Sequence, residues 1–261
     1  MELKLIAQDL AQTCKTTCDA LVLLVPETFK PENSKGKASA TKTTAPHSMQ
    51  DLIAQAMREG DFEAKLSKSL HIYRHALTQA SRLVLVGVGD GSAKSIKTAV
   101  ATAVGGLKSN GTKKLVISLN LVDGTDAASA QAAFFAATDA SYVYTTTKPK
   151  ADARKFTHIT VAVHKDAMNA TQLIASQAYI TPAIAGIEYA KEWGNRPANH
   201  ATPTLLGKAA QSLAKFKNIK VDVLGLKEVS KLGMGSFMSV AQGSDQPLRF
   251  IVLKYSAAAK T

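Results

Sequence analysis

Three runs of consecutive apolar residues constrain the fold of this chain more than any other feature. They lie at Ala20–Val25, Leu83–Val88 and Leu115–Leu119. Strands that are buried on both faces carry continuous apolar runs, because neither face meets water. A further strand is predicted at His158–Val163. Together these runs predict a mostly parallel sheet with helices on both faces, a three-layer α/β/α domain.

Helical patterns separate the predicted strands. Apolar residues recur every three or four positions across Phe62–Leu77, which predicts an amphipathic helix. A second helix is predicted at Ala93–Ala103, capped by Ser92 and ended by Gly105-Gly106, and a third at Asp126–Ala137. This alternation of strands and helices is typical of right-handed parallel α/β folds.

The segment Pro26–Gln50 interrupts the alternation. It contains Pro26, Pro31, Gly36, Pro46 and four lysines, with few apolar residues. We therefore predict a long surface loop there.

A long helical stretch follows at Asn169–Trp193, rich in Ala and Ile. We expect a break at Thr181-Pro182, because proline removes a helical donor and clashes with the preceding turn. Gly194 fits the left-handed position that ends a helix, and Pro197 prevents the helix from resuming. This stretch is interpreted as a connector between two domains.

A second α/β domain begins after the connector. Thr202-Pro203 provides a cap and a first-turn proline for the next helix. The predicted elements that follow are a helix at Thr204–Phe216, a strand at Ile219–Leu224, a helix at Lys227–Leu232, and strands at Phe237–Ala241 and Leu248–Tyr255. The predicted organisation is an N-terminal accessory domain at 1–165, a connector at 166–194 and an incomplete second domain at 195–261.

The residues alone predict no active site. Gly87–Ser92 joins a strand to a helix, but Ser92 and Ala93 stand where the dinucleotide and Walker patterns need glycine, so a tight turn is favoured. His71 and His75 would share a face of the predicted helix without the glutamate of a zinc peptidase between them. Cys14 and Cys18 are expected to be reduced thiols.

The chain carries 32 Lys and Arg against 20 Asp and Glu, a net charge of +12. Such a balance favours phosphate backbones through counterion release, although diffuse charge more often serves solubility. Nucleic-acid binding by residues 1–165 therefore stands as the alternative function. No apolar run reaches the roughly 18 residues of a membrane span.

The segment EWGNRPANHATP, Glu192–Pro203, resembles the hinge sequence of the leucine (cytosol) aminopeptidase family. The resemblance continues in order and spacing through Lys231–Phe237, Val240–Ser244 and Pro247–Tyr255. It is weaker across residues 1–165, where members of the family differ most.

The resemblance implies a cytoplasmic two-domain metallo-exopeptidase that removes N-terminal amino acids from peptides. It implies two divalent ions, manganese or zinc, and usually a homohexamer; some bacterial relatives also bind DNA. Five positions match the family but have the chemistry of helix ends and caps, so they are assigned a structural role: Asn195, Pro197, Asn199, Thr202 and Pro203.

The family's catalytic residues and metal ligands belong to a Lys-Gly-x-Thr-Phe-Asp-Ser-Gly-Gly segment and an Asn-Thr-Asp-Ala-Glu-Gly-Arg segment. Neither segment occurs in these 261 residues. No catalytic residue and no metal ligand is therefore assigned. We expect a truncated N-terminal portion of the enzyme, inactive alone and without a bound metal of its own.

Overall fold

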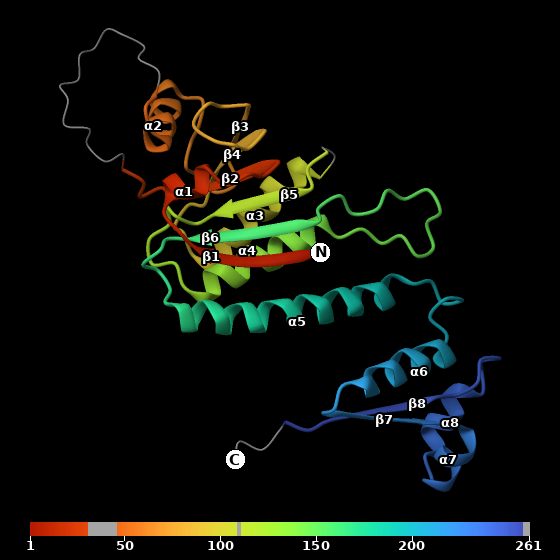
Figure 1. Cartoon of the computed structure of the whole chain (residues 1–261). Helices are drawn as coiled ribbons and strands as arrows, with labels where there is room; N and C mark the ends of the chain where they lie inside the picture. Colours follow the sequence, from red (N-terminus) through yellow and green to blue (C-terminus); the bar gives the residue numbers. More distant parts are fainter. Residues whose placement is uncertain (31–45, 109–110, 258–261) are drawn as a thin grey trace. The chain divides into compact units, whose positions relative to one another are not determined.

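The computed structural model describes residues 1–30, 46–108 and 111–257 (Figure 1). Most of the predicted loop at Pro26–Gln50 therefore lies outside the described residues. The chain divides into two compact units, and each is described by itself. Unit 1 comprises Met1–Thr145 and Lys150–Glu188, and unit 2 comprises Thr146–Pro149 and Tyr189–Thr261. No helix among the described residues is long and apolar enough to cross a membrane.

Unit 1 is built on a six-stranded sheet with the order β1-β6-β5-β2-β4-β3. All neighbouring strands are parallel except β3 and β4, which are antiparallel. The strands predicted from the apolar runs are present, each within one residue. The bounds are β1 Glu2–Ala7, β2 Ala20–Val25, β3 Ser69–Tyr73, β4 Arg82–Gly87, β5 Lys114–Ser118 and β6 His158–Val163.

Helices cover both faces of this sheet, as the apolar runs predict. The helices are α1 Leu10–Cys14, α2 Met49–Glu59, α3 Ala93–Leu107, α4 Ala127–Ser141 and α5 Ala170–Asn195. Val22 and Leu24 of β2 pack with residues of α3, α4 and α5, whereas Leu21 and Leu23 pack with residues of α1 and α2. Two apolar layers thus enclose one sheet, and the α/β/α architecture is confirmed.

The predicted cap at Ser92 and the predicted helix start at Asp126 are confirmed in unit 1. The Ser92 side chain accepts a hydrogen bond from Ser95 N at the start of α3, and Asp126 accepts one from Ser129 N at the start of α4. The predicted end of α3 is wrong, because the helix continues through Gly105 and Gly106 to Leu107. Leu107 is fully buried, so its burial outweighs the low helix propensity of the two glycines.

The helix predicted at Phe62–Leu77 is wrong. The segment contains β3, whose side chains alternate between exposed Ser69, His71 and Tyr73 and half-buried Leu70 and Ile72. The burial of this segment therefore follows the two-residue period of a strand and not the period of a helix. The strand pairs with β4 and completes the edge of the sheet. His71 also approaches α3, where a Cβ at Gly106 would lie 3.3 Å from its Cε1.

The predicted break in the connector helix is also wrong. α5 is continuous through Pro182 and Gly194, and neither position ends it (Figure 1). Pro182 cannot donate to the carbonyl of Ala178, but Ala178 is exposed, so water can reach that oxygen. Gly194 has no positive φ and remains inside the helix.

The outer edge of β1 is covered by a side chain of α5. Gln177 accepts a hydrogen bond from Leu5 N at 2.7 Å and donates from Nε2 to the carbonyl of Leu3 at 3.0 Å. One amide side chain thus supplies the donor and the acceptor that a seventh strand would supply. This contact explains why the sheet can end at β1 without another strand beside it.

Unit 2 contains α6 Pro203–Ser212, a 3-10 turn at Leu213–Lys215, β7 Ile219–Leu224, α7 Leu226–Lys231, α8 Gly235–Ala241 and β8 Phe250–Tyr255. Strands β7 and β8 form an antiparallel pair. The strand predicted at Phe237–Ala241 is wrong, because this segment is α8. The ring of Phe237 lies edge-on to that of Phe250 in β8, with 5.4 Å between the ring centroids. This apolar contact is therefore made by a side chain of a helix.

Replacing Gln177 by alanine should lower the free energy of unfolding by about 1–2 kcal/mol, because a half-buried donor and acceptor on β1 lose their partners. Urea denaturation of both chains measures the difference. Gln211→Ala, on an exposed position of α6, is the control and should change the stability little. Equal stability of the Gln177 variant and the original chain would contradict the edge-covering role.

A second prediction concerns Asp19, whose carboxylate accepts backbone hydrogen bonds from Lys113 and Lys114, each at 2.8 Å. The Lys114 bond is the largest cause that holds the pKa of Asp19 below 3.8. The pKa of Asp19 is lower in the folded than in the unfolded chain, so the charged carboxylate stabilises the fold at pH values above the unfolded pKa. This stabilisation disappears as the pH falls through the folded pKa.

Asp19→Asn should therefore lower the unfolding free energy at pH 7 by about 1 kcal/mol, since the charged acceptor becomes neutral. The difference should shrink when urea denaturation is repeated below pH 4. Asp123→Asn, at an exposed position, serves as the control. A difference that stays constant from pH 7 to pH 3 would exclude the carboxylate as its cause.

Candidate functional site

The five family-matching positions lie at the end of α5 and the start of α6. Asn195 is the last residue of α5, and its Nδ2 donates to the carbonyl of Lys191 at 2.8 Å. Asn199 is exposed in the turn that follows. The contacts of these residues are those of a helix end and a helix cap, which agrees with the structural role proposed for them.

The turn after α5 is held by backbone hydrogen bonds. The carbonyl of Pro197 accepts from His200 N at 2.8 Å and from Ala201 N at 3.0 Å. Thr202 then caps α6, where its side chain accepts from Leu205 N at 3.3 Å and Pro203 occupies the first turn. The predicted cap and first-turn proline are thereby confirmed as local structure.

A compact aromatic and ionic cluster accompanies this turn in unit 2. The guanidinium of Arg196 donates to Glu192 Oε1 from Nε at 3.2 Å and from Nη2 at 3.1 Å. It also stacks over the Trp193 ring, 4.0 Å from the centroid. Tyr189 meets Trp193 edge-on, and its hydroxyl donates to the carbonyl of Ala209 at 2.8 Å. The cluster fixes the end of α5 onto α6.

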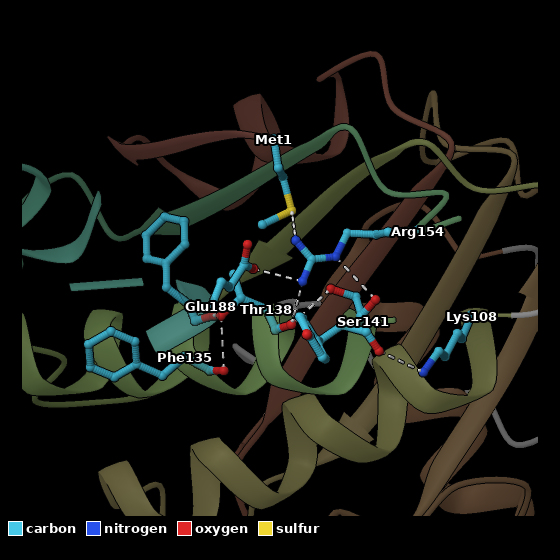
Figure 2. A network of polar contacts seen from close by, with 9 residues as sticks. Met1, Lys108, Phe135, Thr138, Ser141, Arg154 and Glu188 are labelled. Atoms are coloured by element: carbon cyan, nitrogen blue, oxygen red, sulfur yellow. Dashed lines mark hydrogen bonds and ion pairs between the residues drawn. The ribbon is translucent and has the colours of Figure 1, made fainter. Parts of the chain in front are cut away.

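Unit 1 contains a polar network around Arg154 that the sequence analysis did not identify. Figure 2 shows its guanidinium pointing toward Glu188, Thr138, Ser141 and Met1. Arg154 forms an ion pair with Glu188 at 2.7 Å and donates to the carbonyls of Thr138 at 3.2 Å and Ser141 at 3.1 Å. The two charged side chains are only 16% and 31% exposed.

The network satisfies the last turn of α4 and attaches it to α5. Thr138 and Ser141 belong to the last turn of α4, where carbonyls have no helical donor. A cation placed there also suits the negative end of the helix dipole. Arg154 therefore acts as a cross-link between α4, α5 and the loop before β6.

A cleft of about 580 Å³ lies beside this network. Lys108 on its wall donates to the carbonyl of Tyr142 at 3.3 Å. Its lining residues are Gly105, Lys108, Ser141, Val143, Asp152, Ala153, Arg154, Lys155 and Phe156. Arg154 and Lys108 already have protein partners. The cleft therefore offers a ligand fewer available cationic groups than the number of Lys and Arg in its lining.

The glycines of the loop after β4 have structural causes. A Cβ at Gly87 would lie 2.0 Å from the carbonyl oxygen of Lys65, and Gly91 has a φ of 73°. Asp90 occupies the start of α3, where its carboxylate accepts from Ser92 N at 3.0 Å. Hydrogen bonds from the hydroxyl of Ser95, and then from Ser92, lower the pKa of Asp90. The loop is thus a tight turn that the hydrogen bonds of Asp90 and Ser92 hold in front of α3.

The two cysteines are buried, and His71 and His75 do not share a helix face. Burial raises the pKa of Cys14 to about 11 and that of Cys18 to about 12, so both thiols are protonated at neutral pH. His71 lies on β3, whereas Nδ1 of His75 accepts from Leu77 N at 3.2 Å in the turn that follows. In the described ranges, no three His, Cys, Asp or Glu side chains gather as metal ligands would.

Comparison with known families decides the identity that the geometry leaves open. Residues 22–151 match the N-terminal domain of the cytosol aminopeptidase family, and residues 188–261 match its catalytic domain. The chain belongs to the cytosol aminopeptidase family. The resemblance inferred from the hinge sequence is therefore confirmed.

Curated relatives extend the likeness to the full length of this chain. A probable cytosol aminopeptidase of Polaromonas sp. is 44% identical over 263 residues, and one of Albidiferax ferrireducens is 45% identical over 261 residues. Each alignment covers 100% of this chain but only 48% and 50% of the relative. The chain thus spans about half the length of the curated relatives it matches.

Solved structures share the fold of this family member. A mutant of tomato leucine aminopeptidase superposes with a TM-score of 0.78 at 21% identity, over 100% of this chain and 52% of the tomato chain. The bottromycin maturation enzyme BotP in complex with Mn superposes with a TM-score of 0.67 at 19% identity, over 92% of this chain and 46% of BotP.

The Arg154–Glu188 pair yields a stability prediction. Arg154→Met should lower the unfolding free energy by about 2–4 kcal/mol, because it leaves a largely buried carboxylate and the carbonyl of Ser141 without their donor, whereas the carbonyl of Thr138 keeps the Ser141 hydroxyl. Arg154→Met combined with Glu188→Met should cost less than the sum of the single changes. Urea denaturation of the four chains of the cycle measures the coupling; strict additivity would show that the ion pair contributes nothing.

Proposed function

We propose that this chain is the N-terminal portion of a leucyl-type metallo-aminopeptidase that releases N-terminal amino acids from peptides. The observation that carries the proposal is the 44% identity over the whole chain to a probable cytosol aminopeptidase. The match includes residues 188–261 of the catalytic domain, in addition to the accessory domain. The substrates are peptides with a free N-terminus.

The proposed enzyme uses two divalent ions, manganese or zinc. A complex of the structural neighbour BotP with Mn supports metal use in proteins of this fold. The described residues of the present chain do not fit such a pair of ions, because they contain no cluster of three or more His, Cys, Asp or Glu. We therefore derive no catalytic step from these residues, and propose that the 261-residue chain is inactive by itself.

Each part of the chain has a proposed role in the whole enzyme. Residues 1–165 form an accessory domain, 166–194 a connector and 195–261 the start of the catalytic domain. The division of the structure between Glu188 and Tyr189, inside the continuous helix α5, supports a connector at this place. Homohexamer formation and a cytoplasmic location are proposed from family membership.

An assay with leucine p-nitroanilide and added Mn²⁺ or Zn²⁺ tests the proposal. The protein made from the complete reading frame should release p-nitroaniline, and EDTA should abolish the release. The 261-residue chain should release none above the rate with metal alone. Metal-dependent turnover by the 261-residue chain would contradict its proposed inactivity, and no turnover by the complete protein would contradict the aminopeptidase function itself.

A further inference from the structure

The two edge strands of the sheet in unit 1 differ in whether their outward peptide groups have hydrogen-bond partners. Gln177 satisfies the outward peptide groups of β1, as described above. At the opposite edge, β3 pairs only with β4 among the described residues. An edge strand with unpaired peptide groups can accept another strand.

The hydrogen bonds of β3 establish which peptide groups face outward. Gly87 N donates to the carbonyl of Lys68 at 2.8 Å, and Arg74 N donates to that of Ser81 at 3.0 Å. Antiparallel pairing alternates, so the even-numbered residues of this segment face β4. The N–H and C=O groups of Ser69, His71 and Tyr73 therefore point away from the sheet.

The surroundings of this edge are basic. The residues from 64 to 82 include four Lys or Arg, two His and no Asp or Glu. Glu63 is the nearest acid in the sequence, and its carboxylate is paired with Lys65 at 3.2 Å. Lys68 and Arg74 are both exposed and flank the strand at its two ends. Basic groups therefore predominate along this edge, although Asp19 lies close enough to Arg82 to interact with its charge.

An aromatic side chain stands beside the exposed backbone. Tyr73 is 64% exposed, and Arg74 and Arg82 lie 5.4 and 5.9 Å from its ring centroid. Arg74 also donates to the Tyr73 hydroxyl at 3.1 Å, the largest cause that lowers the pKa of Tyr73. A shallow hollow of about 170 Å³ lies here, lined by His71, Ile72, Tyr73, Arg82 and Leu83. It can receive one side chain of a strand laid along β3.

The strand is also held in place at both ends by residues in the left-handed region. Ser67 has a φ of 65° and Arg74 a φ of 50°, and they are the two non-glycine residues with positive φ in the described part of the chain. Such conformations are strained for residues other than glycine and persist where the surrounding structure fixes them. The strand is thus bounded at both ends by a residue in this conformation.

We propose that β3 binds an extended acidic peptide segment as an added strand. Main-chain bonds to Ser69, His71 and Tyr73 supply affinity, and carboxylates beside Lys68, Arg74 and Arg82 supply selectivity. A second copy of β3 is disfavoured, because antiparallel pairing centred on His71 would bring Lys68 of one copy opposite Arg74 of the other. This inference goes beyond the aminopeptidase proposal and does not depend on activity.

The test uses the full 261-residue chain and a fluorescein-labelled hexapeptide of alternating glutamate and valine. Fluorescence anisotropy should show binding of this peptide and much weaker binding of the lysine–valine counterpart. His71→Pro removes one outward N–H, which a partner strand needs but β4 does not, so affinity should fall about tenfold. His71→Ala keeps that N–H, and its affinity should stay within about twofold of the original chain.

Two further measurements keep the proposal falsifiable if His71→Pro fails to fold. Lys68→Glu should weaken binding of the acidic peptide at least about threefold. In the original chain, the peptide should slow hydrogen exchange at the amides of Ser69, His71 and Tyr73. No binding of the acidic peptide, equal affinity of His71→Pro and His71→Ala, or a dimer in sedimentation that His71→Pro abolishes would each overturn the proposal.

Discussion

The complete burial of β2 on both faces is the constraint on which the rest of unit 1 depends. All six of its residues have no exposed surface, and alternate residues belong to the two apolar layers. Each buried Leu or Val contributes about 1.5–3 kcal/mol, so this stabilisation is lost unless helices cover both faces. A strand in this position also has neighbours on both sides, β4 and β5, which makes the long crossovers of the chain necessary.

The sheet edges and the helix ends are completed by single polar side chains. Gln177 provides β1 with a donor and an acceptor, and Arg154 provides the last turn of α4 with donors while its charge meets Glu188. The Gln177 contacts attach α5 to β1, and the Arg154–Glu188 pair connects α5 with α4. The long helix is thus held by directional bonds as well as by its buried Ile180 and Ile184. β3 lacks an equivalent partner among the described residues, which distinguishes it from the other edge.

The sequence predicted those elements whose signals are local. The apolar runs identified β2, β4, β5 and β6, and the capping residues Ser92 and Thr202 identified the starts of α3 and α6. The alanine-rich segment after Asp126 identified α4. The errors occurred where packing outweighs propensity: at β3, at Pro182, and at α8, where Phe237 packs on Phe250 from a helix. The family was recognised from the order of its motifs. The Arg154 network was missed because Thr138, Arg154 and Glu188 are far apart in the sequence and form no local pattern.

Gly106 shows how an unfavourable residue in one element can serve another. Glycine in the middle of a helix costs about 1 kcal/mol relative to alanine, and α3 accepts it close to its end. The imidazole of His71 lies where a methyl group at this position would crowd it, 3.3 Å from the missing carbon. The absent side chain leaves room beside α3 for the ring of His71. A glycine in α3 thus accommodates a side chain of β3 that lies some thirty-five positions earlier in the chain.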